Sequence, residues 1–234
     1  MKAARWSDLR GKERKDKPWL DGLPRTIFVG DMGDFCSKSV PDEYIESEIF
    51  RAIKSPEGQR HFWLLLTKQI QRLAKLSEKM GELPDNCMAM TTVTDQYYAD
   101  MRIPWLLRTR CKWRGVSVEP MLGPVRLTDV KIPADALLPE YGTSYGFKFN
   151  ALSEDDEHCF YSLARLNWAI AGGESGDNYR TPELAWMYKV SDDCHDCGVP
   201  VFIKQDSGPR PGLRGRIPVD RCFKEMPGLT SGLV

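Results

Sequence analysis

Phe62-Trp63-Leu64-Leu65-Leu66-Thr67-Lys68 is the stretch of sequence that decides the fold, because an unbroken apolar run ends there in a threonine and a lysine. A strand with one wet face alternates apolar and polar residues, whereas a continuous run is typical of a parallel strand buried on both faces. Comparable runs rich in branched, aromatic or sulfur-containing side chains occur at 26–29, 87–93, 113–118, 168–171 and 200–203. These runs predict the strands of a parallel sheet.

Helical patterns separate several of these strands. Apolar residues recur at helical spacing over 41–54, 69–80, 96–108 and 182–197. Pro41 suits a first helical turn, and we expect Thr181 to cap the last of these helices with Pro182 at its first position. Pro104 predicts a bend or an early end of the third helix.

Strands that alternate with helices predict an α/β fold with a parallel sheet. The number of predicted strands is too small for a closed eight-stranded barrel, so we expect a TIM-barrel-like partial (β/α) barrel, with an open doubly wound sheet as the alternative. We expect an irregular basic arm at 1–24, the barrel at 25–206 with an insertion at 129–165, and an irregular tail at 207–234.

The charge balance and composition bound the class of protein. Lys and Arg total 33 and Asp and Glu total 33 among 234 residues, of which 41% are hydrophobic. A chain of this length and composition can bury one substantial core, and its neutral balance does not favour a dedicated nucleic-acid coat protein. The sequence contains neither a signal peptide pattern nor an apolar run long enough to span a bilayer, so we expect a cytoplasmic protein with no membrane contact.

The seven cysteines are scattered and odd in number, which favours reduced thiols over a disulfide framework. Cys194 and Cys197 form a lone C-x-x-C pair at the end of a predicted helix, and Cys36 has no neighbouring cysteine. We interpret all three as structural thiols, and no motif predicts a metal site built from Cys or His.

Polar residues follow each predicted strand, where the loops of a parallel fold converge on one mouth. Capping of the next helix is the simpler explanation for any one of them, but carboxylates directly after buried runs are costly to desolvate without a partner. We therefore expect Glu119, Glu174 and Lys204 to be the catalytic residues. The candidate cofactor-binding residues are Asp31, Asp34, Thr67, Lys68, Thr92, Ser117, Gly172, Gly173, Ser175 and Gln205.

The turn GGESG (172–176) lets backbone N–H groups approach a ligand, but it matches neither the phosphate loop nor the dinucleotide fingerprint. Both an anion site and a simple tight turn at a strand exit therefore remain open.

An ordered set of short strings carries a family resemblance. The strings are IFVGDMGD (27–34), VPDE (40–43), LLTK (65–68), SVEPMLGP (117–124), GGESG (172–176) and the segment 198–205. Together they resemble an uncharacterised phage and prophage protein family that is itself similar to radical S-adenosylmethionine enzymes. The resemblance spans roughly residues 3 to 206.

The resemblance implies a partial barrel whose mouth holds an iron–sulfur cluster and S-adenosylmethionine. It also implies a three-cysteine segment upstream of the matching region, and the 234 residues contain no such segment. The expectation is therefore a gene fragment, a cysteine segment on another chain, or a lineage without the radical chemistry, since a cluster with a unique iron needs three thiolates.

Three functions remain open from the sequence. The first is a radical-type enzyme or its barrel. The second is a non-catalytic phage module that binds nucleic acid or a protein through the basic arm, whose cations are Lys2, Arg5, Arg10, Lys12, Arg14, Lys15 and Lys17. The third is a metal-dependent hydrolase with Asp31, Glu119 and Glu174 as oxygen ligands.

Overall fold

The computed structural model describes residues 24–30, 33–136, 147–154 and 164–228. Six parallel strands form one curled sheet in the order β1-β2-β3-β4-β7-β8. They are β1 (Thr26–Val29), β2 (Phe62–Thr67), β3 (Cys87–Thr92), β4 (Trp113–Val118), β7 (Trp168–Gly172) and β8 (Val201–Gln205). The sheet is a half-barrel with β1 and β8 at its two ends, which confirms the predicted partial barrel.

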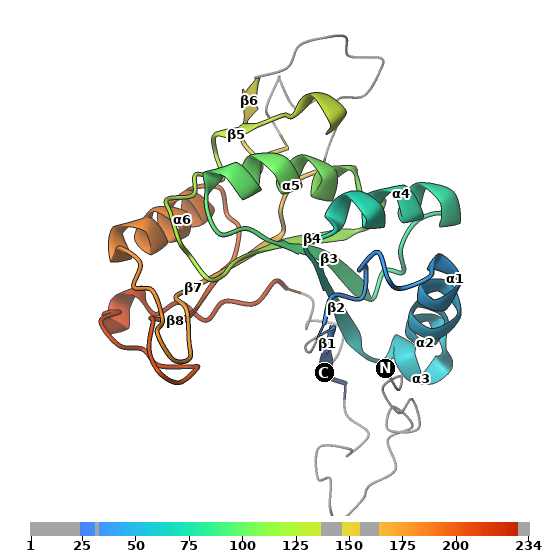
Figure 1. Cartoon of the computed structure of the whole chain (residues 1–234), viewed down its shortest axis with the longest axis horizontal. Helices are drawn as coiled ribbons and strands as arrows, with labels where there is room; N and C mark the ends of the chain where they lie inside the picture. Colours follow the sequence, from blue (N-terminus) through green and yellow to red (C-terminus); the bar gives the residue numbers. More distant parts are fainter. Residues whose placement is uncertain (1–23, 31–32, 137–146, 155–163, 229–234) are drawn as a thin grey trace, which may run out of the picture.

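Helices cover the convex face of this half-barrel (Figure 1). They are α1 (Asp42–Tyr44), the π-helical turn Ile45–Phe50, α2 (Arg51–Lys54), α3 (Pro56–Gln59), α4 (Ile70–Met80), α5 (Gln96–Arg108) and α6 (Leu184–Asp196). The three long helices α4, α5 and α6 lie on the same side of the sheet in Figure 1. A doubly wound sheet requires helices on both faces, so that alternative is not the observed fold.

Each strand turns alternate residues to opposite faces, and both faces are apolar. On β2, Trp63 and Leu65 belong to the large cluster under the helices, whereas Phe62 and Leu64 belong to a second cluster on the concave face. This double burial explains why the β2 sequence is a continuous apolar run. The concave cluster also contains Met88, Met90, Trp168 and Ile170.

One predicted helix range is confirmed and another begins too early. Helix α5 spans the predicted 96–108 and continues through the buried Pro104, so the early end that Pro104 suggested does not occur. Helix α6 begins at Leu184 rather than near Pro182, because Glu183 has an extended backbone and the Pro182 carbonyl accepts a hydrogen bond from Arg216. The predicted cap at Thr181 is therefore not formed.

The described part of the 129–165 segment forms a small antiparallel pair, β5 (Val130–Lys131) with β6 (Lys148–Phe149), and a 3-10 turn at Ala134–Ala136. Near the C-terminus, a 3-10 turn at Val219–Arg221 leads into a segment that pairs with the free edge of β8 through an antiparallel bridge between Phe202 and Lys224. Apart from Pro24, the predicted basic arm at 1–24 lies outside the described residues. No described helix has the length and apolarity needed to cross a bilayer.

Candidate active site

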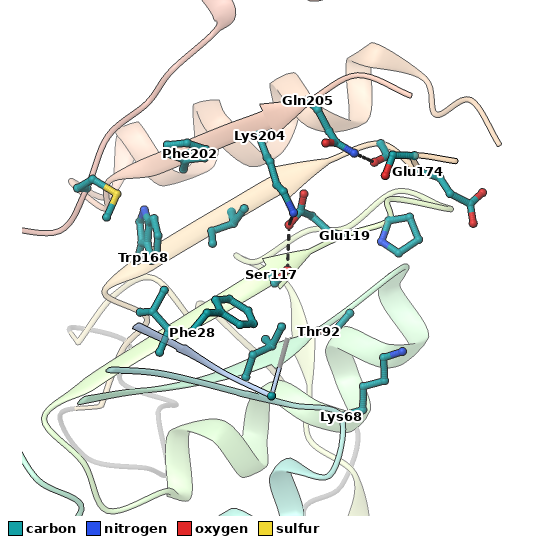
Figure 2. Close-up of a pocket in the computed structure, with 18 residues that line it drawn as sticks. Phe28, Lys68, Thr92, Ser117, Glu119, Trp168, Glu174, Phe202, Lys204 and Gln205 are labelled. Carbon is teal, nitrogen blue, oxygen red and sulfur yellow. Dashed lines mark hydrogen bonds and ion pairs between the residues drawn. The ribbon is translucent and has the colours of Figure 1, made fainter. Parts of the chain in front are cut away.

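The concave face of the half-barrel holds a pocket of about 710 Å³ that opens at the carboxyl ends of the strands (Figure 2). Its polar lining comes from the ends of five strands: Lys68 after β2, Thr92 on β3, Ser117 and Glu119 at β4, Gly173, Glu174 and Ser175 after β7, and Lys204 and Gln205 on β8. Parallel strands bring these positions to one edge, as in other α/β folds. The volume is in the range of small-molecule sites.

The floor of the pocket is apolar. Counting back by two from Lys68 leads to Leu66 and Leu64, and counting back by two from Lys204 leads to Phe202. The remaining floor residues are Phe28, Trp168, Ile170 and Met226. The pocket therefore changes from apolar to polar along the strand direction.

Glu119 and Lys204 form the central ion pair of the mouth. The Lys204 ammonium lies 3.4 Å from Oε2 of Glu119, and the Ser117 hydroxyl lies 3.3 Å from the same oxygen. The Glu119 side chain is only 15% exposed, whereas that of Lys204 is 52% exposed. Burial raises the pKa of Glu119 above its ordinary value, and Lys204 and Ser117 only partly offset this effect.

Gly172 gives the Glu119 carboxylate its position. Glu119 follows β4 and Lys204 lies on β8, so the carboxylate has to pass over β7, the strand between them. A Cβ at Gly172, on β7, would stand 2.5 Å from Oε1 of Glu119. Because Gly172 has no side chain, the Glu119 carboxylate can extend over β7 to the Lys204 ammonium.

Glu174 has a different environment. Its Oε2 accepts hydrogen bonds from the backbone N–H and Nε of Arg180, both at 2.8 Å, and its Oε1 accepts one from Nη2 of the same arginine at 2.6 Å. These bonds lower the pKa of Glu174 to about 2. The carboxylate therefore stays ionised and holds the loop between β7 and α6 at the pocket rim.

A second arginine clamps the loop after β8. Asp206, whose side chain is 3% exposed, accepts hydrogen bonds from Nε, Nη2 and the backbone N–H of Arg216. Gln205 joins the two loops, because its amide donates to the Gly173 carbonyl and accepts from the N–H of Gly212. The β7 and β8 sides of the mouth are thus one hydrogen-bonded unit.

Asp34 and Thr67 stabilise the β2 side of the pocket mouth without lining the pocket. The Asp34 carboxylate accepts bonds from the Thr67 hydroxyl at 2.6 Å, the Lys68 N–H at 2.8 Å and the Cys36 N–H at 3.0 Å. The first two bonds tie Asp34 to the end of β2, and the third stabilises the turn at 34–36.

The structure brings most of the predicted site residues to the pocket. Lys68, Thr92, Ser117, Glu119, Gly173, Glu174, Ser175, Lys204 and Gln205 line it. Asp34, Thr67 and Gly172 lie beside it without lining it, and Asp31 lies outside the described residues.

Sequence reasoning missed the apolar lining and Gly30 and Pro120. The period-two spacing back from Lys68 and Lys204 is a signal that could have found Leu64, Leu66 and Phe202. No local signal marks Met226, because it reaches the pocket only through the pairing of the C-terminal segment with β8.

The described residues do not fit an iron–sulfur cluster, and Asp31 of the predicted carboxylate metal site lies outside them. No group of three His, Cys, Asp or Glu side chains suited to a metal occurs in residues 24–30, 33–136, 147–154 and 164–228. Burial raises the pKa of the Cys36 thiol to about 12, as expected for a buried structural cysteine. Burial likewise raises the pKa of Cys194, and among the described cysteines both Cys194 and Cys197 are free.

Comparison with known proteins gives one match. Residues 3–215 match the model of a family described as "Protein of unknown function (DUF5131)". No curated protein and no solved structure matches the chain.

Proposed function

The chain belongs to the DUF5131 family of proteins of unknown function, and we propose that it is an enzyme that uses Glu119 as an acid–base group on a small molecule. The observation that carries this proposal is the largely buried Glu119 carboxyl, which has a raised pKa and lies at the mouth of a small-molecule pocket. Carboxyls of this kind are characteristic of active sites, because a raised pKa lets one group both release and accept a proton near neutral pH.

The neighbours of Glu119 have distinct roles in this proposal. When the carboxyl is ionised, the Lys204 ammonium at 3.4 Å stabilises it, and the Ser117 hydroxyl orients the same oxygen. When Glu119 has taken a proton, Lys204 is free to stabilise negative charge on the bound molecule. Glu174 is a positioning residue in this scheme, since Arg180 occupies both of its oxygens.

We propose that this half-barrel shares its origin with the barrel of radical S-adenosylmethionine enzymes. The open sheet of six parallel strands supports that proposal. Because the described residues do not fit a cluster, no step of the proposed chemistry passes through one. A phage or prophage setting stays a prediction from the resemblance.

The first experiment measures the pKa of Glu119 directly, by titration of its side-chain carboxyl with ¹³C NMR. We expect a midpoint above that of an exposed glutamate. In Lys204→Met it rises further, because the main offsetting charge is gone. In Lys79→Gln, an exposed site on α4, it stays as in the wild type. An ordinary pKa for Glu119 contradicts the proposal.

The second experiment follows the consumption of a metabolite mixture by ¹H NMR. Wild type and the exposed-site control Glu82→Gln are expected to consume the same compound. Glu119→Gln loses the proton-transfer contribution of the group, about 10²-fold or more in rate. Equal consumption by Glu119→Gln and wild type rules out the acid–base role.

A further inference from the structure

We propose that the molecule bound in this pocket is a flat apolar ring system carrying an anionic group, with the ring on the floor and the anion beside Lys68. This inference rests on the proposed function for its site, but it concerns ligand chemistry and not the role of Glu119. It follows from three features of the pocket: the exposed apolar floor, the charges at the mouth, and the order of the two along the strands.

The floor exposes aromatic and sulfur-containing side chains at the concave face. Phe28 is 41% exposed and Met226 is 44% exposed, and both line the pocket. Trp168 and Phe202 meet edge to face in the same floor, with ring centroids 6.3 Å apart. Large apolar side chains left exposed in a concavity indicate a binding surface for an apolar partner, and aromatic walls favour a flat one.

The charges at the mouth favour an anion. Glu174 is neutralised by Arg180, and Glu119 is paired with Lys204. Within the described part of the chain, the Lys68 ammonium makes no ion pair. The nearby Asp34 carboxylate is engaged by backbone and hydroxyl donors, which reduces its effect on Lys68 without removing it.

The order of floor and cation sets how the ligand lies. Leu64 and Leu66 lie on one face of β2 with a step of about 7 Å, and Lys68 follows directly after the strand and lines the same pocket. A ring resting against Leu66 and Phe28 therefore places a substituent on a short arm within reach of Lys68. Figure 2 shows Lys68 on the opposite side of the pocket from Lys204 and Glu119, so the anion does not need to displace that pair.

The test compares three probes with the same ring: indole-3-acetate, indole-3-ethanol and tryptamine, which carry a negative, neutral and positive arm. Dissociation constants are measured by calorimetry on the full chain. We expect indole-3-acetate to bind about fivefold more tightly than indole-3-ethanol, the effect of one contact between exposed charges, and tryptamine to bind most weakly. In Lys68→Gln the ratio of the first two constants falls to about 1, whereas Lys79→Gln keeps the wild-type ratio.

A second pair of variants tests the floor. Phe28→Ala is expected to weaken all three probes about tenfold, as the loss of one large apolar contact does. Phe147→Ala is its matched control, since Phe147 is 43% exposed and does not line the pocket. Failure of all three probes to bind, an anion preference that survives in Lys68→Gln, or a Phe28→Ala affinity equal to that of Phe147→Ala overturns the inference.

The outcomes separate this inference from the proposed function. An ordinary pKa for Glu119 together with a Lys68-dependent preference for indole-3-acetate leaves the ligand class standing and overturns the acid–base proposal. A raised Glu119 pKa without binding of any probe leaves the acid–base proposal standing and overturns the ligand class.

Discussion

Glu119 and Glu174 are two glutamates at neighbouring strand ends with opposite electrostatic states. Burial dominates at Glu119 and raises its pKa, whereas the Arg180 hydrogen bonds dominate at Glu174 and lower its pKa to about 2. A group with a pKa of about 2 is a poor proton acceptor near neutral pH, which is why the proposed acid–base role is given to Glu119 and not to Glu174. The difference comes from what each carboxylate contacts, since the residue type is the same.

Gly172→Ala is expected to displace the Glu119 carboxylate from Lys204 and Ser117 and to lower the free energy of unfolding only slightly. The new Cβ would stand 2.5 Å from the Glu119 carboxylate, the end of a flexible side chain that can move away. We expect a loss of about 1 kcal/mol in the free energy of unfolding, at the low end of overpacking costs. The ¹³C titration midpoint of Glu119 is expected to shift, because the distances to Lys204 and Ser117 change.

Gly228→Ala is the control for this prediction, since a Cβ at Gly228 meets nothing within 4 Å. Its Glu119 titration is expected to match the wild type. An unchanged midpoint in Gly172→Ala would show that the carboxylate does not depend on the open space above β7.

At the scale of the elements, the strands position the residues that line the pocket, and hydrogen bonds in the loops after β7 and β8 fix the pocket mouth. Five strands carry polar residues at or just beyond their carboxyl ends, and arginine hydrogen bonds hold the loops after β7 and β8 in place. Burial raises the pKa of Asp206, but the hydrogen bonds from Arg216 outweigh that effect, and the net pKa is lowered. The Asp206–Arg216 clamp therefore stabilises the ionised form of the acid.

Arg216→Ala is expected to reduce the free energy of unfolding by about 2 kcal/mol at pH 7, because it leaves a buried carboxylate without its charged donors. The stability that Asp206 contributes is present above its unfolded pKa and is lost as the pH falls through its lower folded pKa. The difference between variant and wild type should therefore shrink on acidification. Urea unfolding at a series of pH values measures both effects.

Arg210→Ala, an exposed site in the same loop, is the matched control and is expected to behave as the wild type at every pH. A constant difference between Arg216→Ala and wild type from neutral to acidic pH would show that the clamp does not act through the charge of Asp206.

At the scale of the whole molecule, the sheet separates two apolar clusters that do different work. The cluster under the helices is buried and holds the fold together, whereas the concave cluster contributes Leu64, Trp168 and Ile170 to the pocket floor. Neighbouring residues on one strand can therefore serve stability and binding separately.

Leu65 and Leu66 test this division, because they are adjacent and of the same type. Leu65 is fully buried under the helices, and Leu66 is half-buried in the pocket floor. Leu65→Ala is expected to cost about 3 kcal/mol in urea unfolding, and Leu66→Ala about 1 kcal/mol. Leu66→Ala should also weaken the indole probes, whereas equal losses of stability in the two variants would contradict the two-cluster arrangement.

The sequence by itself determined where along the chain the apolar strand segments lie, where most helices lie, and which polar residues follow each strand. These are local properties, because side-chain hydrophobicity and its period depend only on neighbours along the chain. Parallel pairing was already implicit in strands that alternate with helices, and with it the gathering of Glu119 and Lys204 at one edge.

Only the tertiary structure decided which of those polar groups became partners and what surrounds them. Glu119 pairs with Lys204 over Gly172 of the intervening strand β7. Glu174 pairs with Arg180, and Met226, near the end of the described residues, lines the pocket floor. Curvature of the sheet and the path of each loop set these contacts. Both arise from packing between segments distant in sequence, which no local pattern encodes.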